Sequence, residues 1–561
     1  MTTNTEKSVS LGNGDVTHFS DLSMHMEALF LSQKYYDVIL IVEGNRLMAH
    51  KVVLAARCQY FRALFFGGLA ESSQNEITLP HVPFEAFKLL VNYMYTGFMP
   101  LSKLKVDVML DTLGLADQYG FQNLVTSISN HLKQSLDIDN ASIILNTAKL
   151  YDLDELVLDS IQFLDRNASA IVLHESFNYL SEASLIEILQ RDSFFAPELD
   201  IFKAVCCWSE FHGIGIDNIL WNVRLPLIKE IDLLTTVKAS GFIEPSKLQE
   251  VISGRIKTKL LYRGQLIENE NVASRRFRTE VISEPLEMFL LDEDYSEKKF
   301  CTRHYVRWVD YKGIIIKLGQ PSIINHIKLL LWDGDTRYFY SYYIDVSIDQ
   351  KNWTRVIDYT HYDCRSWQYL FFERQVVHYI KIVGTSGTDG FFHLSGVEAM
   401  YKSVVPSMLN DIICPSYNVA TLDKHAIVIE GLSTIPNSLI DGNCTRDCWN
   451  LAYTCHKIRS GAIVIQLAQP YVISSLRLQL WDLDDDNYSK YYIESSVNYE
   501  DWQMLVDNTK EQCKSWQEII FPETVVVYIR IVGTFNTVNE KFYCGHFECP
   551  SMKIIESAKN R

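Results

Sequence analysis

An internal duplication in the second half of the chain restricts its fold more than any other feature. When the sequence is shifted by 149 residues, positions 318–385 align with 467–534 without a gap, and 29 of these 68 positions are identical. A repeat of this length indicates two tandem domains of about 130 residues each, because solenoid and propeller units span only about 20–50 residues. The shared motifs are Gln320-Pro321 with Gln469-Pro470, Trp332-Asp333 with Trp481-Asp482, Tyr342-Tyr343-Ile344 with Tyr491-Tyr492-Ile493, Ser366-Trp367-Gln368 with Ser515-Trp516-Gln517, and Ile382-Val383-Gly384-Thr385 with Ile531-Val532-Gly533-Thr534.

The two halves of the chain differ in their hydrophobic pattern. After residue 265 the sequence is rich in β-branched and aromatic runs such as GIIIKL, YYIDVSI and VVHYIKIVG, which predict β-sandwiches or barrels. Before residue 265 apolar residues recur at helical spacing, with short strand-like runs such as YDVILIV between them. We therefore expect a multidomain chain, α/β at first, then mostly helical, and finally all-β.

Charge and composition exclude several function classes. The chain has 52 Lys and Arg against 69 Asp and Glu, a net charge of −17, so its overall field repels nucleic-acid phosphates and anionic membranes, although a local basic patch stays open. Its start is polar, and no run of 18 apolar residues occurs, so we expect a cytoplasmic protein without a membrane span. The 12 Cys include no CxxC pair, which argues against a zinc ribbon, a RING finger or a thioredoxin-like centre.

Residues 35–97 form the most specific local pattern: a strand, a turn, a second strand, two short helices and a further amphipathic stretch. With its flanks, this segment (17–133) resembles a BTB/POZ domain, an α/β fold. The resemblance implies a homodimer formed through the leading helix, whose apolar stripe is Phe19, Leu22, Met26 and Leu29. The same stripe fits a helix packed on its own core equally well. The motifs that carry the resemblance are Asp37-Val38, Ala49-His50-Lys51, Phe61-Arg62-Ala63, Tyr95-Thr96-Gly97 and Ala116-Asp117-Gln118-Tyr119-Gly120.

The loop that follows residue 66 predicts a binding partner. Leu69 stands in a Gly-flanked, exposed segment, where an apolar side chain is unfavourable unless a partner covers it, and Glu71 can order the loop. In BTB proteins that bind cullin-3, this position carries a hydrophobic-x-Glu motif, so the resemblance implies cullin binding by Leu69 and Glu71, with Tyr95 as a further contact. His50 and Asp37 could suggest a general base, but no nucleophile accompanies them, and we interpret them as structural.

Residues 134–245 are successive amphipathic helices and resemble a BACK domain, an all-α extension found behind BTB domains in ubiquitin-ligase adaptors. The resemblance implies that this domain extends the surface facing the cullin. Residues 246–270 are expected to be a linker.

Each copy of the repeat resembles a discoidin domain of the factor V/VIII C type, an all-β jelly-roll sandwich, at 271–400 and 417–549. The second copy carries Asp441-Gly442-Asn443 and Trp449, close to the family's early Asp-Gly loop, which is a possible target-binding loop. The first copy has Leu291-Asp292-Glu293-Asp294 without Gly, so the same role is in doubt there. Cys414 and Cys549 match the terminal disulfide of extracellular discoidin domains, but in a chain without a secretory signal we expect reduced thiols.

Two groups in the second copy suggest metal sites, and neither has the required spacing. Asp482, Asp484 and Asp486 lack the Gly and Glu of an EF-hand loop, which favours a solvated acidic turn. Cys444, Cys448, Cys455 and His456 fit no standard zinc pattern. We expect no metal, no cofactor and no catalytic residues, since the chain has no GxSxG, HExxH or Walker A motif.

These resemblances together predict a non-enzymatic adaptor. The BTB and BACK domains would hold cullin-3 within a RING E3 ubiquitin ligase, and the discoidin-like pair would bind a protein target of unknown identity. Two alternatives stay open: a dimeric interaction scaffold that works without cullin, and a glycan- or lipid-binding protein.

Overall fold

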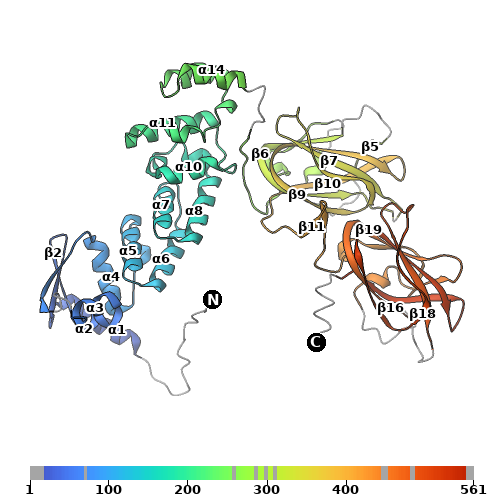
Figure 1. Ribbon diagram of the computed structural model, residues 1–561, viewed down its shortest axis with the longest axis horizontal. Helices are drawn as coiled ribbons and strands as arrows, with labels where there is room; N and C mark the ends of the chain where they lie inside the picture. Colours follow the sequence, from blue (N-terminus) through green and yellow to red (C-terminus); the bar gives the residue numbers. More distant parts are fainter. Residues whose placement is uncertain are drawn as a thin grey trace. The chain divides into compact units, whose positions relative to one another are not determined.

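The computed structural model describes residues 18–68, 73–254, 261–283, 288–295, 301–306, 313–335, 337–443, 453–480 and 487–550. The chain divides into two compact units, residues 1–260 and 261–561 (Figure 1). Each unit has its own hydrophobic cores, and each is described by itself.

The first unit begins with an α/β domain built on a three-stranded sheet in the order β2-β1-β3. β1 and β2 form a hairpin whose turn residues, Glu43 and Gly44, both have positive φ (47° and 76°), as a tight two-residue turn requires. β3 returns parallel to β1. The elements are α1 (Phe19–Ser32), β1 (Val38–Val42), β2 (Asn45–Ala49), α2 (Lys51–Arg57), α3 (Gln59–Phe66), β3 (Glu76–Leu79), α4 (Phe84–Thr96), α5 (Val106–Gln118) and α6 (Gln122–Gln134).

An all-α domain follows and completes the first unit. Its core includes the fully buried Trp208, whose indole Nε1–H donates to Leu180 O at 2.8 Å. Cys206 is buried in the same core, whereas Cys207, which the sequence pattern also predicts to be a packing residue, is exposed. The helices are α7 (Ala141–Leu150), α8 (Asp154–Arg166), α9 (Ala168–Ile171), α10 (Glu182–Gln190), α11 (Glu198–His212), α12 (Asp217–Leu220), α13 (Glu230–Asp232), a π-turn (Leu233–Val237) and α14 (Pro245–Gly254).

Residues 246–270, expected to be a linker, contain structured parts at both ends. α14 packs Leu248 into the core of the helical domain, because its amphipathic pattern continues past residue 245. Gln265 pairs in parallel with Ser322 of β6 (Ile314–Leu331). Its N–H donates to Pro321 O, and its carbonyl accepts from Ile323 N. The described connection is therefore shorter than the sequence pattern indicated.

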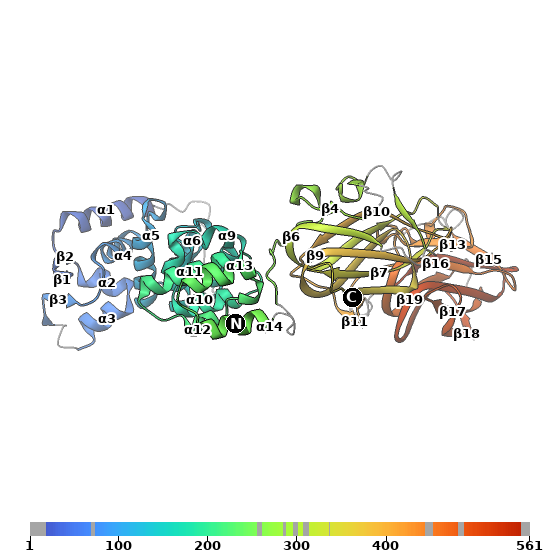
Figure 2. The ribbon, with the colours of Figure 1, turned by 90° about the horizontal axis from the view of Figure 1, so that it is seen from above.

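The second unit holds two β-sandwiches. In the first β-domain the strand order is β5-β10-β6-β9-β7-β8, with β4 beside β6. Figure 2 shows β6, β9 and β7 lying next to one another. The pairing of the long strands β6 and β9 passes through two register shifts, places where a strand bends. The elements are β4 (Glu280–Val281), a 3₁₀ turn η7 (Met288–Leu291), β5 (Thr302–Tyr305), β6 (Ile314–Leu331), β7 (Tyr340–Ser347), β8 (Thr354–Cys364), β9 (Trp367–Gly387) and β10 (Phe391–Met400).

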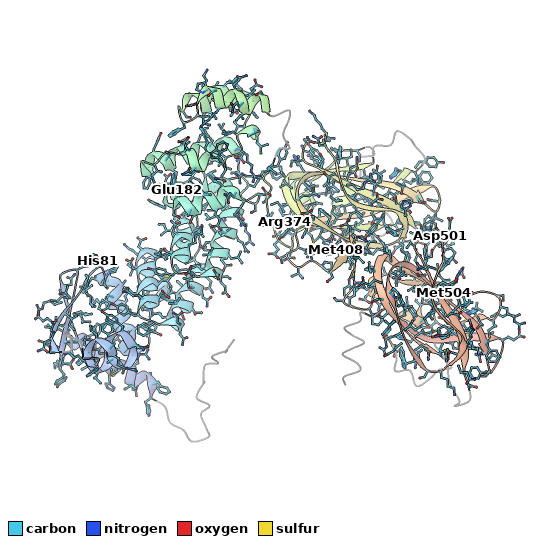
Figure 3. All side chains as sticks on the ribbon, in the orientation of Figure 1. His81, Glu182, Arg374, Met408, Asp501 and Met504 are labelled. Atoms are coloured by element: carbon cyan, nitrogen blue, oxygen red, sulfur yellow. The ribbon has the colours of Figure 1, made fainter. Side chains whose placement is uncertain are left out.

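The second β-domain repeats this topology in the order β14-β15-β20-β16-β19-β17-β18. Figure 3 shows side chains over both units and labels Asp501 and Met504 of this domain, which lie at and just after the turn that begins β18. The elements are β11 (Met408–Leu409), β12 (Ile412–Ile413), β13 (Ile427–Glu430), β14 (Leu432–Ser433), a 3₁₀ turn η9 (Ser438–Ile440), β15 (Thr454–Lys457), β16 (Ile463–Leu480), β17 (Ser489–Ser496), β18 (Gln503–Cys513), β19 (Trp516–Asn536) and β20 (Lys541–Glu548).

The repeated Ser-Trp-Gln motif builds the same turn in both β-domains. Ser366 and Ser515 adopt left-handed backbones (φ 55° and 54°), and the following Gln side chain donates back to the carbonyl three residues earlier. The other end of that amide accepts from the first Tyr of the Tyr-Tyr-Ile motif, at 3.1 Å for Tyr342 to Gln368 and 3.4 Å for Tyr491 to Gln517. Two motifs far apart in sequence thus close one polar network in each core.

The Gly of the Ile-Val-Gly-Thr motif is also explained by packing. A Cβ at Gly384 would lie 2.2 Å from the ring of Phe392, and a Cβ at Gly533 would lie 2.2 Å from Phe542. Only a residue without a side chain leaves room for these rings, which accounts for the repetition of Gly at both positions.

The two β-domains meet at an interdomain junction, formed by the end of β8 and the start of β9 on one side and by β16 and β19 on the other. The Gln469 side chain bonds the Tyr369 backbone twice, accepting from its N–H at 2.6 Å and donating to its carbonyl at 3.0 Å. Ala468 O accepts from Arg365 N and from Gln368 Nε2, at 2.9 and 2.8 Å. Buried backbone groups are paired across the junction, so it is a packed contact rather than a loose tether.

A carboxyl is buried in the same junction. Asp363 Oδ2 accepts from the Tyr528 hydroxyl at 3.1 Å, and that hydroxyl accepts from Gln466 Nε2 at 3.0 Å. Burial raises the pKa of Asp363 to about 6. The junction therefore holds a titratable group whose charged form is disfavoured.

Candidate functional site

The leading helix α1 packs on its own domain along only part of its apolar stripe. Phe30 is buried against the ring of Tyr95, with centroids 5.1 Å apart, and Met26 and Leu29 are half-buried on the same core. Phe19 and Leu22, at the start of the helix, are 70% and 61% exposed. The C-terminal end of the stripe thus packs on the core of its own domain, and the N-terminal end is an exposed apolar surface.

The exposed end of the stripe forms one wall of a groove. The groove has a volume of about 500 Å³ and lies between α1, α2 and α4. Val52, on the opposite wall, is 67% exposed. Exposed apolar surface of this size is common where proteins bind partners, so the groove is a candidate interaction surface. Its lining includes Phe19, Leu22, Met26, Val52, Val53 and Met94.

Leu69 and Glu71, predicted to bind the cullin, lie outside the described residues. The structure describes how the chain leaves α3 just before them. A Cβ at Gly67 would clash with Ala63 O at 2.3 Å, and Gly68 has a φ of 76°, so the two glycines end the helix. Phe66, the last residue of α3, is 64% exposed.

Tyr95, predicted as a further cullin contact, is buried. Its hydroxyl accepts from His50 N at 2.9 Å and lies 2.7 Å from His50 Nδ1, and burial raises the pKa of Tyr95 to about 12. His50 Nε2 lies 2.9 Å from Lys34 O, so both of its ring nitrogens are engaged. Asp37 accepts from Lys51 N at the start of α2. These contacts give His50 and Asp37 structural roles.

The possible target-binding loop of the second β-domain is described in part. Asp441, Gly442 and Asn443 are exposed and follow the buried turn η9, and Asn443 N donates to Asp441 Oδ1 at 3.0 Å. Trp449 lies outside the described residues. The described residues of the loop thus follow a buried turn and are exposed to solvent, as residues of a recognition loop are expected to be.

The matching loop of the first β-domain is held differently. Asp292, which follows η7, forms an ion pair with Arg275 at 2.9 Å. The Asp292 carboxylate is therefore engaged within its own domain. The loop that lacks the Gly of the second copy thus also has a different contact, the Arg275–Asp292 ion pair.

The residues that suggested metal sites have other partners or lie outside the described residues. His456 Nε2 accepts from Gly533 N at 2.9 Å, and burial lowers the pKa of His456. Cys444, Cys448, Asp482, Asp484 and Asp486 are not described. Within the part of the chain that the structure describes, no group of three or more His, Cys, Asp or Glu side chains could hold a metal ion. Cys414 and Cys549 are free thiols.

Comparisons with known families match each domain. The BTB/POZ domain matches residues 26–136, the BACK domain (BTB And C-terminal Kelch) matches 142–238, and the F5/8 type C domain matches twice, at 289–396 and 430–544.

Whole-chain relatives extend these matches. BTB/POZ domain-containing protein 9 of Drosophila melanogaster is 47% identical over 560 residues, which cover 98% of this chain and 77% of the relative. The human protein of the same name is 45% identical over 556 residues, 98% of this chain and 90% of the relative. The chain belongs to the BTB/POZ domain-containing protein 9 family. A more distant relative, Kelch-like protein 21 of Danio rerio, is 29% identical over 248 residues, 43% of this chain and 40% of the relative.

Family membership confirms the sequence-based fold class, namely an α/β BTB domain, a helical BACK domain and two β-sandwiches of the F5/8 type C kind. These are protein-interaction domains, and nothing in the comparisons indicates an enzyme. In the described part of the chain, no helix has the length and apolar character needed to cross a membrane.

Sequence reasoning missed two features of these surfaces. Val52 and Met94 complete the groove although neither belongs to the predicted stripe, and a periodicity within one helix carries no signal for them. The interdomain junction was also missed. Its Gln469 occurs in a motif shared by both copies, so the sequence alone does not reveal which copy uses it.

Proposed function

We propose that this protein is a substrate-recruiting adaptor of a cullin-3 RING E3 ubiquitin ligase. The BTB and BACK domains would bind cullin-3, and the two F5/8 type C domains would bind the protein target. The adaptor would work in the cytoplasm without a cofactor and without chemistry of its own. The observation that carries this proposal is the domain order, a BTB–BACK unit joined to a separate unit of two sandwiches.

The cullin-facing surface is proposed to centre on Leu69 and Glu71. In the sequence the motif comes directly after the two glycines that end α3, and Phe66, the last residue of that helix, is exposed. Tyr95 is buried, so its contribution would be to hold His50 and the start of α2 in place rather than to contact the cullin.

A homodimer is proposed to form over the groove at α1. Phe19 and Leu22 expose apolar surface there, and covering it in a two-fold contact would remove that surface from water. A dimer would carry two cullin sites and four sandwiches, so that weak contacts to a target could reinforce one another.

The target-binding part is proposed to be the second unit, acting as one body. The paired hydrogen bonds of Gln469 with Tyr369 support a fixed arrangement of the two sandwiches. Within it, the proposed contact is the Asp441-Gly442-Asn443 loop, whose three residues are exposed, together with Trp449.

The test measures binding of the full chain to the N-terminal region of cullin-3 by calorimetry, and the stoichiometry of the complex by light scattering. We expect two cullins per dimer, and about 100-fold weaker binding for Leu69→Asp because a central apolar contact is replaced by a charge. Glu71→Ala should weaken binding by a smaller factor. Leu22→Asp should give a monomer that still binds one cullin.

Leu432→Asp is the matched control, since Leu432 is a comparably exposed leucine (68%) in the second β-domain. It should bind cullin-3 as the natural sequence does. If the natural sequence does not bind, the adaptor proposal fails and a cullin-independent scaffold takes its place. Specific uptake of a glycan or lipid by residues 261–561 would favour the third function.

A further inference from the structure

A thiol, an imidazole and a carboxylate lie in a row in the first β-domain. Cys301 directly precedes β5, His393 belongs to β10, and Asp389 lies in the turn between β9 and β10. Cys301 Sγ is 3.5 Å from His393 Nδ1, and His393 Nε2 is 2.9 Å from Asp389 Oδ2. The imidazole therefore contacts the thiol with one nitrogen and the carboxylate with the other.

The strand pairing fixes this arrangement. β5 and β10 are antiparallel, with Arg303 opposite His393. Cys301, two residues before Arg303, therefore lies diagonally across from His393. Asp389 is held by its own turn, because its other oxygen accepts from Phe391 N at 3.0 Å. His393 thus lies on a paired strand, Cys301 directly precedes one, and Asp389 lies in a turn closed by its own hydrogen bond.

The surroundings restrict what can reach the thiol. His393 is buried (6% exposed) and is packed by the rings of Trp332, Tyr338, Tyr340 and Phe391, with centroids 5.7–6.1 Å away. Cys301 is only partly exposed. A small reagent fits such a position better than a macromolecule does.

Other polar and titratable groups face the row from neighbouring elements. The Tyr340 hydroxyl, which feels the charges of Asp389, Cys301 and Asp333, donates to Trp332 O at 3.1 Å. His304 of β5 lies near enough to His393 to interact electrostatically with it. Asp389 is the carboxylate in direct contact with the His393 ring among the described residues.

We propose that Cys301 is an activated thiol and that small peroxides are the reagents that modify it. His393 Nδ1 would take the thiol proton, and the Asp389 carboxylate would stabilise the imidazolium that forms. The thiolate sulfur then forms a bond to one peroxide oxygen while the O–O bond breaks. Sulfur is oxidised to a sulfenic acid, and the departing hydroxide takes the proton from His393 and leaves as water.

The second β-domain provides an internal comparison. Pairing of β15 with β20 places Tyr453, Tyr543 and Asn539 at the positions of Cys301, His393 and Asp389. Asn539 Nδ2 donates to the Tyr543 hydroxyl at 3.2 Å, and the two Tyr rings meet edge to face at 5.2 Å. The geometry is kept in the second copy while the proton-transfer chemistry is absent, so the activation belongs to the first copy alone.

The test uses the full chain and measures labelling rates of individual cysteines with iodoacetamide by peptide mass spectrometry. Alkylation joins sulfur to carbon and releases iodide, so it reports the thiolate. At pH 7, Cys301 should react about fivefold faster than the more exposed Cys207, because a larger thiolate fraction outweighs lower intrinsic nucleophilicity. Hydrogen peroxide followed by dimedone should mark Cys301 as a sulfenic acid.

Variants then separate activation from exposure. His393→Gln should slow labelling of Cys301 about fivefold at pH 7, and Asp389→Asn should slow it about twofold, whereas Tyr543→Phe should leave it unchanged. Circular dichroism checks folding, and if His393→Gln unfolds the domain, the Asp389→Asn variant decides. The proposal is overturned if Cys301 reacts no faster than Cys207, or if the deciding variant leaves its rate unchanged.

Discussion

The two β-domains share their framework and differ in what surrounds it. Both close the same Tyr–Gln–carbonyl network, both need Gly beside a buried Phe ring, and both bury a His that accepts from that Gly N–H, at 3.1 Å for His304 and 2.9 Å for His456. They differ at the junction, at the loop after η7 or η9, and at the Cys301 row. The residues that hold each sandwich together are thus the same in both copies, whereas residues at the ends of the sandwiches differ.

The interdomain junction gives the largest expected difference between the copies. Asp363 is buried there, and its counterpart Gln512 is exposed. The folded-state pKa of Asp363, about 6, lies above its ordinary value of 3.8, so the folded unit loses stability as pH rises from about 4 to about 6, by up to about 3 kcal/mol.

Asp363→Asn should remove this loss. At pH 7.5 the variant should stabilise residues 261–561 by about 2 kcal/mol, less than the full shift because the amide N–H₂ needs a partner, and at pH 4 the difference should vanish. Urea unfolding of this unit at the two pH values checks the expectation. Gln512→Asn is the control and should have no effect, and equal effects of the two substitutions would contradict the assignment of Asp363 to a buried junction.

A second prediction concerns two glutamines that the repeat makes equivalent. Gln469→Ala should destabilise the second unit by about 2 kcal/mol, because the N–H and C=O of Tyr369 lose their partner in a buried place. Gln320→Ala should cost less than about 0.5 kcal/mol, since Gln320 is exposed. Thermal unfolding of both variants measures the difference. Similar losses at both positions would show that the contact seen at Gln469 contributes little.

The smallest expected effect concerns a cation that each copy places over a Trp ring. Lys381 lies over Trp353 and pairs with Asp345, and Arg530 lies over Trp502 and pairs with Glu494. Asp345 also pairs with Arg355, a second cation for which Glu494 shows no counterpart among the described ion pairs. Arg530→Met should therefore cost about 1 kcal/mol more than Lys381→Met at low salt. Urea unfolding in low and high salt checks this, because screening should reduce the gap.

The framework could be predicted from the sequence because it depends on residues that occur twice. Two copies of the same Gly, Trp and Gln at equal spacing predict two sandwiches without knowledge of their contacts. The division of the α1 stripe could not be predicted, because its periodicity fits either packing, and only the positions of α2 and α4 decide that Met26 is half-buried and Leu22 is exposed.

Among the candidate sites, too, local motifs could be predicted and contacts made by the fold could not. Leu69 and Glu71 form a local motif, so they could be predicted from neighbouring residues and from the family resemblance. Cys301 and His393 are 92 positions apart and belong to no shared motif, so their proximity depends on the pairing of β5 with β10. Gln469 carries a motif common to both copies, and its role at the junction follows from the order in which the copies are joined.

The junction is directional, since the Ser-Trp-Gln end of the first copy meets the Gln-Pro end of the second. Contacts of this head-to-tail kind do not close on themselves, and the second copy has a Ser-Trp-Gln end of its own. That end has Lys514 and Glu518, both exposed, where the first copy has the half-buried Tyr369 and the buried Arg365. Pairing at that turn would strip water from the Glu518 carboxylate, whose counterpart Tyr369 is uncharged, so the turn of the second copy is less suited than that of the first to pair with a Gln-Pro strand.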